Sequence, residues 1–307
     1  MKKKILILAG GYSNEREISF LTAKSVFKEL EKTKKYLIKI EDPKGDFIKN
    51  LRKFKPHIVF NALHGRYGED GYIQSILESE KVKYTHSGIL SSSLAIDKEI
   101  TKKIYIKNKI LTPKYIKFTF KKKIKYKNIL KIVQKKFGFP VVIKPLNEGS
   151  SVDVYICKKF NLIKNLKKLF DYKEIIIEKY IPGREIQAAI MGNKKLGIIE
   201  LKPKRKFYDY KAKYNRNAGT KHIIPVNINK KKYEEVMSIA LKAHRILNCR
   251  GITRSDFRFY KNKFYLLETN TQPGLTSLSL VPEIAKYRKI SFLKLINWII
   301  KDASTNR

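Results

Sequence analysis

Short apolar runs alternate with amphipathic stretches over the first 95 residues of the chain. Residues 3–11 (KKILILAGG), 36–40 (YLIKI) and 57–63 (HIVFNAL) have the length and content of buried strands, and 81–85 (KVKYT) is expected to add another. Helices are expected to begin at about Glu15 and at about Glu69. Because short strands that alternate with helices are typical of a parallel sheet, this part of the chain predicts a parallel-sheet α/β unit.

The pattern changes near residue 96 and again near residue 185. Between these points we expect a helix, a strand at 140–145 (PVVIKP), a glycine-serine loop, a strand at 152–156 (VDVYI), a lysine-rich helix and a strand at 174–181 (EIIIEKYI). Further on, 185–192 (EIQAAIMG) and 194–202 (KKLGIIELK) predict an antiparallel pair around a GNKK turn. The chain therefore predicts an α/β (α+β) fold in three units, 1–96, 97–184 and 185–307.

A helix and a hairpin complete the expected elements. The helix runs from about Lys231 to Leu247, and its apolar residues at helical spacing predict one buried face. The hairpin consists of 251–260 (GITRSDFRFY) and 263–270 (KFYLLETN), joined by a turn at Lys261–Lys263. Glu268 and Asn270 share one face of its second strand, where apolar side chains would be expected.

Composition limits the class of protein. Of the 307 residues, 43% are hydrophobic and 11% aromatic, which suffices for two or three compact domains and excludes a disordered chain. Two cysteines are too few for a disulfide framework or a zinc site, and they fit a reducing compartment. The apolar run near the N-terminus is too short for a signal peptide, and no run approaches the roughly 20 residues of a membrane span. We therefore expect a cytoplasmic protein.

The chain is strongly basic, with 68 Lys and Arg against 27 Asp and Glu and a formal net charge of +41. Such an excess could serve binding to nucleic acid or to an anionic membrane, because contact with phosphate releases counterions. It could also reflect drift towards Lys, Ile and Asn in an AT-rich genome. Since the lysines are spread through nearly every segment and do not gather beside aromatic residues, we interpret the charge as drift. We expect neither specific nucleic-acid binding nor membrane binding.

The hairpin carries a candidate metal site. If its strands pair antiparallel about Asn262, Asp256 lies beside Glu268, and Asn270 follows two residues along the same face. Three oxygen ligands without His or Cys suit a hard cation, Mg²⁺ or Mn²⁺, which usually also takes phosphate oxygens of a substrate. An ordinary polar strand end is the alternative interpretation.

Two segments of the middle unit carry candidate anion-binding chemistry. Lys144 directly follows an apolar strand, and its ammonium would be buried unless an anion meets it. The glycine and serines at 149–151 have the composition of a phosphate-binding loop, although an ordinary serine turn explains them equally well. Residues 178–181, followed by a Pro-Gly turn and Glu185, could present backbone groups to an adenine and a carboxylate to a ribose, or form a common strand and turn.

The start of the first helix carries a candidate acid. Asn14 and Glu17 predict an N-cap with its reciprocal partner, which would place Glu15 in the first turn, facing the crevice at the strand ends. The alternative is a solvated acid that only complements the helix dipole.

Ten motifs together resemble one family. In chain order they are GGYSNEREIS, ALHGRYGEDG, YTHSG, AIDK, VVIKP, NEGSSV, IEKYIPGRE, FYDYKAKY, RSDF and LLETNTQPGLTSLSLVP. Their order and spacing resemble those of bacterial D-alanine–D-alanine ligases of the ATP-grasp superfamily, over nearly the whole chain. The resemblance implies a Rossmann-like N-terminal domain (1–96) that precedes central (97–184) and C-terminal (185–307) ATP-grasp subdomains.

The resemblance also implies the reaction. ATP would phosphorylate the carboxylate of one D-alanine, and the amine of a second would attack the acyl phosphate, which supplies peptidoglycan synthesis. Each step develops negative charge on oxygen, so cations and backbone donors are required. Two Mg²⁺ or Mn²⁺ ions would bind Asp256, Glu268 and Asn270. Implied ATP-binding residues are Lys98, Lys144 and Lys213 at the phosphates, Ser151 in the loop, Glu178, Lys179, Tyr180 and Ile181 at the adenine, and Glu185 at the ribose.

The residues implied for D-alanine come from distant segments. Glu15 would bind the ammonium of the first D-alanine and contact Ser150 and Tyr214, and His64 would lie near this substrate. Arg254 and the backbone N–H of Gly274 would form the oxyanion hole, and Ser279 with Leu280 would bind the carboxylate of the second D-alanine. Residues 206–220 would form a lid that keeps water from the acyl phosphate, with a disordered basic loop as the alternative. A homodimer is usual for the family.

Two positions depart from the family pattern. Asp153 and His86 stand where the family usually has glycine, and an aspartate there would bring negative charge near the triphosphate. Two other functions stay open. One is another ATP-grasp carboxylate ligase, such as a D-alanine–D-lactate ligase, in which relatives commonly carry phenylalanine at the position of Tyr214. The other is a basic nucleic-acid-binding protein without catalysis.

Overall fold

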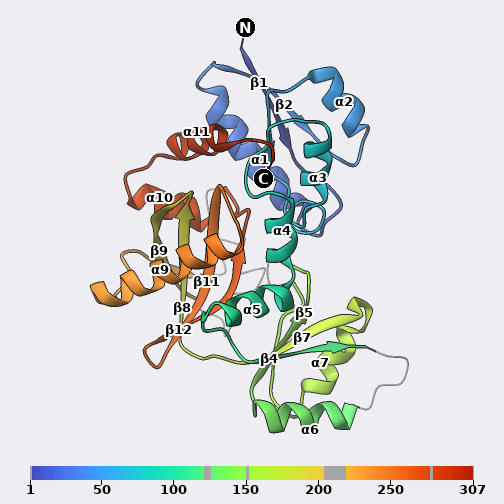
Figure 1. Ribbon diagram of the computed structural model, residues 1–307, viewed down its shortest axis with the longest axis vertical. Coiled ribbons are helices and arrows are strands. Elements are labelled where there is room, and N and C mark those ends of the chain that lie inside the picture. Colours follow the sequence, from blue (N-terminus) through green and yellow to red (C-terminus); the bar gives the residue numbers. More distant parts are fainter. Residues whose placement is uncertain (1, 121–125, 150–151, 204–218, 277–278, 307) are drawn as a thin grey trace.

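The computed structural model describes residues 2–120, 126–149, 152–203, 219–276 and 279–306. Its strands form three sheets that follow one another along the chain, as Figure 1 shows. The first sheet is parallel and the other two are antiparallel, and helices cover each of them. This mixture is the predicted α/β (α+β) architecture.

The first sheet has the order β2-β1-β3 and is covered on both faces. Its elements are β1 (Lys3–Leu8), α1 (Arg16–Glu31), β2 (Tyr36–Glu41), α2 (Phe47–Phe54), β3 (Ile58–Asn61) and α3 (Tyr72–Ser79), and α4 (Ile89–Ile96) follows. Leu6 and Leu8 pack with residues of α2 and α3, whereas Ile5 and Ile7 pack with residues of α1. Burial on both faces explains why β1 is apolar at every position from Ile5 to Leu8.

Two expectations for this unit are wrong. Residues 81–85 do not form a strand, because only Tyr84 makes isolated bridges, to Val59 and Ser304. Helix α1 has Glu15 as its N-cap residue in place of Asn14, and the Glu15 side chain makes no capping hydrogen bond. Instead, the Glu15 N–H donates to Ser13 Oγ at 3.0 Å. The predicted capping box is therefore absent, and the Glu15 carboxylate does not serve to cap the helix.

The second sheet has the order β4-β7-β5-β6. Its elements are α5 (Lys98–Lys107), β4 (Tyr115–Thr119), α6 (Tyr126–Lys136), β5 (Val141–Pro145), β6 (Tyr155–Cys157), α7 (Leu162–Lys168), the 3₁₀ helix η1 (Phe170–Tyr172) and β7 (Glu174–Lys179). Ile143 of β5 and Ile177 of β7 face a core formed with α6 and α7. Because side chains alternate along a strand, Val142 and Lys144 face the opposite side of this sheet.

The third sheet has the order β10-β9-β8-β11-β12. Its elements are β8 (Arg184–Met191), β9 (Lys194–Lys202), β10 (Lys221–Ile223), α9 (Lys230–Ile246), β11 (Ile252–Tyr260), β12 (Lys263–Asn270), α10 (Leu280–Tyr287) and α11 (Phe292–Asp302). The predicted pair β8–β9 and the predicted hairpin β11–β12 are confirmed. The predicted helix corresponds to α9, which packs its apolar face against one side of the sheet.

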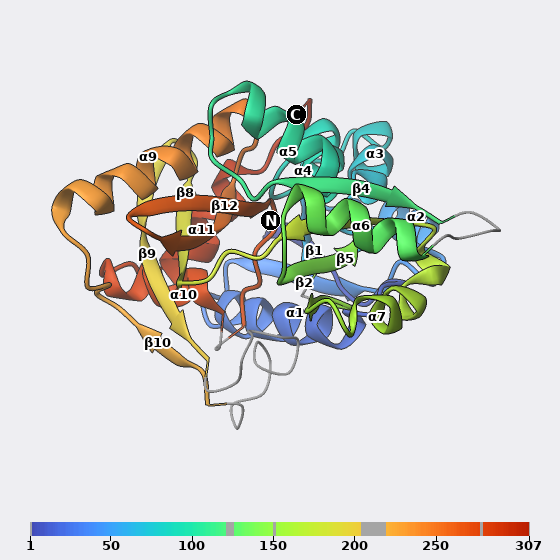
Figure 2. The same ribbon diagram turned by 90° about the horizontal axis from the view of Figure 1, so that it is seen from below.

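The last helices join the third unit to the first. One continuous core includes Ile7 of β1, Ile284 of α10 and Ile296 of α11. Figure 1 shows α11 beside α1 and places α6 and α7 at the end of the molecule opposite the N-terminus, and Figure 2 shows α6 and α7 to the right of the view and α9 to the upper left. The first and third units therefore form one packed body. None of the helices in the described ranges is long and apolar enough to cross a membrane.

Candidate active site

Two adjoining pockets lie between the three units. The inter-sheet pocket is lined by residues of the second and third sheets, among them Val142, Lys144, Glu178, Ile181, Glu185, Asp256 and Leu267. The junction pocket draws residues from the first and third units, among them Glu15, His64, Glu69, Arg254, Asn270 and Gly274. Lys98, Glu148, Gly149 and Glu268 line both. The two pockets therefore share a wall, at which groups bound in each could meet.

The hairpin β11–β12 forms that shared wall. Its register places Asp256 opposite Glu268 and Arg254 opposite Asn270, which confirms the predicted approach of the two carboxylates. A register shift between Asp256 and Phe257 marks a bulge beside them. The Arg254 guanidinium donates two hydrogen bonds to the Asp256 carboxylate, from Nε to Oδ1 at 2.7 Å and from Nη2 to Oδ2 at 3.0 Å. The arginine expected at the oxyanion hole therefore binds an expected metal ligand in this structure.

The donor chemistry of the hairpin fits a hard cation. Two carboxylates and the Asn270 amide offer oxygen atoms only, as Mg²⁺ or Mn²⁺ prefers. The part of the chain that the structure describes contains no group of three or more His, Cys, Asp or Glu side chains placed to hold a metal. Phosphate oxygens of a substrate would therefore have to complete the coordination shell, which is typical of Mg²⁺ sites in phosphoryl-transfer enzymes.

Lysines gather on the other side of the inter-sheet pocket. Lys98 begins α5, and its Nζ donates to the carbonyl oxygens of Leu146 at 3.4 Å and Glu148 at 2.5 Å. The Nζ of Lys144 on β5 lies 2.6 Å from Glu178 Oε1. Lys102, which was not predicted, places its Nζ 2.9 Å from Glu178 Oε2. A weak signal for Lys102 exists in the sequence, since it follows Lys98 by four residues and shares its helix face.

The pKa values of these groups follow from burial and from their partners. Burial would raise the pKa of Glu178, but the ammonium groups of Lys102 and Lys144 outweigh it and hold the value at about 2. Burial lowers the pKa of Lys98 and Lys102. Burial also acts to lower the pKa of Lys144, yet the Glu178 and Glu268 carboxylates raise it above its usual value. Two ammonium groups therefore share the single Glu178 carboxylate, and Lys98 and Lys144 line the pocket, where they could meet an anionic ligand.

The rest of the inter-sheet pocket suits a planar ring. Val142, Val152, Val154, Ile181 and Leu267 supply apolar walls, and Lys179 and Tyr180 also line the pocket. Glu178 lies among the residues expected at the adenine, but its carboxylate is engaged by the two lysines. Glu185, expected at the ribose, lies in the same pocket with Oε2 at 3.0 Å from Arg258 Nη2.

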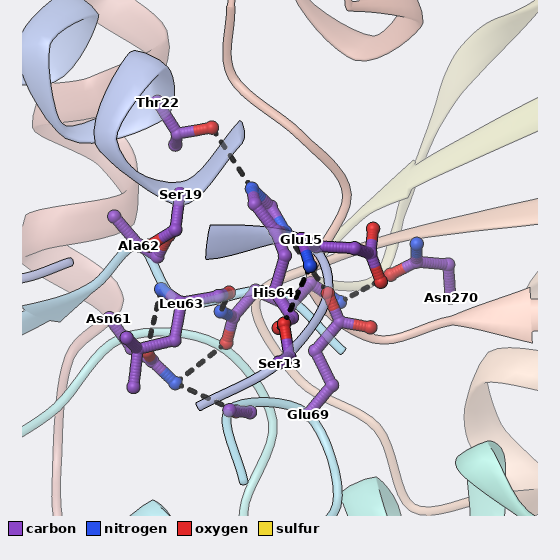
Figure 3. Close-up of polar contacts among 12 residues, drawn as sticks. Ser13, Glu15, Ser19, Thr22, Asn61, Ala62, Leu63, His64, Glu69 and Asn270 are labelled. Atoms are coloured by element: carbon purple, nitrogen blue, oxygen red, sulfur yellow. Dashed lines mark hydrogen bonds and ion pairs between the residues drawn. The ribbon is translucent and has the colours of Figure 1, made fainter. Parts of the chain in front are cut away.

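Glu15 enters the junction pocket between two glycines. A Cβ atom on Gly65 would lie 2.7 Å from Glu15 Oε2, and one on Gly149 would lie 3.0 Å from the same oxygen. Gly65 also has a φ of +67°, which favours glycine. Figure 3 shows Glu15 together with His64 and Asn270, which line the same pocket. The structure therefore brings the helix start, Gly149 and the hairpin to one place.

His64 is buried and held at both ring nitrogens (Figure 3). Its Nε2 lies 2.9 Å from Thr22 Oγ1, and its Nδ1 lies 3.0 Å from Glu69 Oε1. Burial alone would lower the pKa of His64, but the hydrogen bond and charge of Glu69, together with the charge of Glu15, raise it above its usual value. The Glu69 and Glu15 carboxylates therefore favour the protonated imidazole more than burial alone would allow.

The remaining expected residues lie beside the junction pocket or outside the described residues. A Cβ on Gly274 would lie 3.0 Å from Ser279 Oγ, which accepts the Thr276 N–H at 2.9 Å. Leu280 packs in the core between the first and third units, and neither Ser279 nor Leu280 is among the residues that line the pocket. Ser150, Ser151, Lys213 and Tyr214, with residues 206–218 of the expected lid, lie outside the described residues. Their roles stay predictions.

The two departures from the family pattern have the backbone conformation of glycine. Asp153 has a φ of +52° and His86 a φ of +70°. The Asp153 carboxylate accepts hydrogen bonds from the hydroxyls of Tyr155 at 2.8 Å and Tyr172 at 2.6 Å. The two tyrosine hydroxyls therefore stabilise the additional carboxylate by hydrogen bonds.

Comparison with known proteins agrees with this geometry. A family model described as "D-ala D-ala ligase C-terminus" matches residues 105–301. The chain is 62% identical over 307 residues to the D-alanine–D-alanine ligase of Pelagibacter ubique, with 100% of each chain covered. The D-alanine–D-alanine ligase of Bacillus anthracis, at 34% identity, superposes with a TM-score of 0.85, and its complex with ATP with a TM-score of 0.83; each comparison covers 98% of this chain and 97% of the other. The chain therefore belongs to the D-alanine–D-alanine ligase family.

Proposed function

We propose that the protein joins two D-alanines to D-alanyl-D-alanine at the expense of ATP, through a D-alanyl phosphate, and so supplies peptidoglycan synthesis. The observation that carries this proposal is the shared wall of the two pockets. One pocket has apolar walls and lysines, the other has Glu15 and Arg254, and Lys98 and Glu268 line both. A phosphoryl group could pass from a nucleotide in the first pocket to a carboxylate in the second across this wall.

The inter-sheet pocket would hold ATP. The apolar walls would contact the adenine, Glu185 would meet the ribose, and Lys98 and Lys144 would meet the phosphates. Mg²⁺ bound by Asp256, Glu268 and Asn270 would neutralise the charge that develops during phosphoryl transfer. A cation at Asp256 would also compete with Arg254 for its carboxylate and leave the guanidinium available to a second anionic group.

The junction pocket would hold the two D-alanines. Glu15 would bind the ammonium of the first, and His64 lines the same pocket. Arg254 and the Gly274 N–H would stabilise the oxyanion of the tetrahedral intermediate. Ser279, whose Oγ lies close to Gly274, and Leu280 would bind the carboxylate of the second D-alanine, and residues 206–220 would exclude water.

One assay distinguishes this function from its alternatives. Phosphate release from ATP is measured with D-alanine, L-alanine and D-lactate, and the products are identified by mass spectrometry. We expect phosphate release only when D-alanine is present, with D-alanyl-D-alanine as the product. A depsipeptide as the main product would favour a D-alanine–D-lactate ligase. Absence of D-alanine-dependent phosphate release would overturn the proposal.

We also propose a cytoplasmic location, where ATP is available, and a homodimer. Sedimentation velocity at several protein concentrations tests the assembly, and a single species at the mass of one chain would contradict it. The high positive charge is not expected to serve recognition. A gel-shift titration at physiological salt should show only weak, sequence-independent binding, with Kd no tighter than roughly 10⁻⁶ M.

A further inference from the structure

We propose that Lys102 is a positioning residue for ATP: it neutralises Glu178 independently of Lys144, so that Lys144 can leave this carboxylate and bind the nucleotide. The proposal rests on the proposed function, because it places ATP in the inter-sheet pocket. Lys102 is not part of the pocket surface, whereas Lys144 and Glu178 both line it. Its influence on a ligand would therefore pass through Glu178.

Lys102 is fixed by groups from three segments. Its side chain is fully buried, with 0% exposure, and its Nζ lies 2.9 Å from Glu178 Oε2. The same ammonium donates to Thr112 Oγ1 at 2.7 Å and lies 5.7 Å from the centre of the Tyr115 ring. A buried lysine with this set of partners cannot turn toward a ligand without leaving an unpaired buried charge, which is strongly unfavourable. Lys102 therefore stays with Glu178 when the pocket fills.

The Glu178 carboxylate is divided between the two lysines. Its Oε1 faces Lys144 at 2.6 Å, and its Oε2 faces Lys102. The low pKa of Glu178, about 2, keeps this carboxylate charged. Lys144 borders the pocket, so its ammonium can pair either with Glu178 or with an anionic ligand bound there. Of the two lysines that contact Glu178, Lys144 is the one that can exchange this carboxylate for a ligand.

Without the Lys102 charge, movement of Lys144 from Glu178 to an anionic ligand would be unfavourable. Lys144 would then be the only ammonium within ion-pair distance of Glu178 in the described part of the chain. A buried carboxylate with one counterion holds it tightly, because separation leaves the carboxylate uncompensated. The same uncompensated charge would repel the triphosphate. Lys102 removes both effects, since Glu178 keeps one counterion in either state.

The main test measures nucleotide affinity directly. Lys102→Gln keeps a polar side chain that can hydrogen bond but removes the charge. For this variant we expect the Kd of the Mg²⁺ complex of a non-hydrolysable ATP analogue to rise about tenfold or more. The KM for D-alanine should change much less. Lys103→Gln is the matched control, because Lys103 lies on the same helix, has a 63% exposed side chain and pairs with Glu99. The Lys103→Gln variant should bind the analogue with the same affinity as the wild type.

A second substitution separates charge from structure. The variant Lys102→Gln with Glu178→Gln lacks both charges, and we expect it to recover most of the affinity that Lys102→Gln loses. If Lys102 only supported the fold, the second substitution would add to the loss, and that result would overturn the proposal. Equal analogue affinity in Lys102→Gln and the wild type would overturn it as well.

The role of Lys102 can be tested even if the Lys102→Gln variant does not fold. Thermal unfolding of each variant shows whether it folds. If Lys102→Gln does not fold, Glu178→Gln is compared with the double variant, and equal analogue affinity within about twofold is expected because Lys102 acts through the Glu178 charge. Weaker analogue binding by the double variant than by Glu178→Gln would contradict an action of Lys102 through Glu178. Failure of the wild type to bind the analogue would count against the proposed function, which the D-alanine assay tests separately.

Discussion

At the scale of single residues, the site depends on buried charges that each have a defined partner. Glu178 is held by two lysines, Asp256 by Arg254, and the His64 ring by Glu69 and Thr22. Taking a charge out of water costs several kcal/mol, so such groups stay charged only when a partner compensates for that cost. Substitutions that remove one partner should therefore have large and specific effects.

Replacing Glu268 with Gln should abolish turnover. Glu268 lies opposite Asp256, and a cation that bridges this pair to phosphate would lose an anionic ligand. We expect kcat to fall more than about a hundredfold, as when a group that stabilises charge in the transition state is removed. Phosphate release in millimolar Mg²⁺ measures the effect, and circular dichroism checks the fold. Glu235→Gln, on the outer face of α9, is the control. Near wild-type turnover would contradict the metal assignment.

His64 should titrate above its usual pKa of 6.5. Burial opposes this shift, but the Glu69 carboxylate outweighs it. Because the folded-state pKa is raised, the stability that His64 contributes should be complete below pH 6.5 and be lost as pH rises through the folded-state pKa. Glu69→Gln should lower the pKa and weaken this pH dependence. NMR titration of the imidazole and urea denaturation across pH measure both, and an identical titration in wild type and variant would refute the pairing.

At the scale of elements, alternation along the strands separates the core from the site. In β5, Ile143 faces the helices while Lys144 faces the inter-sheet pocket, and in β7 the same holds for Ile177 and Glu178. The burial of one face thus orients the charges on the other. The segment that leads into β6 is held in a different way, through Asp153 and its two tyrosines.

Asp153→Gly should destabilise the protein even though it relieves a positive φ. The carboxylate accepts one hydrogen bond from Tyr155 on β6 and one from Tyr172 on η1. Together these outweigh the cost of a left-handed non-glycine residue, so we expect the free energy of unfolding to fall by about 1–3 kcal/mol. Urea denaturation measures this difference. Tyr172→Phe removes only one of the bonds and should have about half the effect. A glycine variant more stable than the wild type would show that strain dominates.

At the scale of the whole molecule, the end of the chain closes onto its beginning. Helix α11 packs against α1, and Ser304 forms a bridge with Tyr84. Arg250 secures this bridge, because Nη1 donates to Ser304 Oγ at 2.8 Å and Nη2 to the Tyr84 carbonyl at 3.2 Å. The first and third units both line the junction pocket, and they are thus also joined through residues that do not line it.

Arg250→Ala should lower the free energy of unfolding. The guanidinium also lies 4.9 Å from the centre of the Tyr84 ring, so the variant loses hydrogen bonds and a cation–π contact. We expect a loss of about 1–3 kcal/mol and unchanged kcat at temperatures where the variant is folded. Chemical denaturation provides the measurement. Arg245→Ala, on α9, should change stability by less than about 0.5 kcal/mol. Equal stability of both variants would exclude this role for Arg250.

Several features followed from the sequence alone. The class of fold, the pairing of β8 with β9, the β11–β12 hairpin and the approach of Asp256 to Glu268 were predicted correctly. These are local properties, because a short turn and the alternation of side chains set the register of neighbouring strands. The order of the motifs was sufficient to indicate the family.

Other elements were missed or wrong because local signals were weak. The strands β4 and β10 and the helices α2, α4, α6, α10 and α11 were not predicted. In β4, α2 and α6, frequent lysines interrupt the apolar pattern. Residues 81–85 have a strand-like composition, yet only Tyr84 finds bridge partners. At the start of α1, Ser13 binds the Glu15 N–H, so the expected capping box does not form.

Only the tertiary structure decided which charges from distant segments meet. Lys102 on α5 and Glu178 on β7 are far apart in the chain, and nothing in their spacing predicts that they form a buried pair. The same holds for the approach of Glu15 to Gly65 and Gly149. The sequence determined which groups are available and on which face of an element each lies. The free energy of a buried charge depends on the partner beside it, and that partner is set by how the sheets pack against one another.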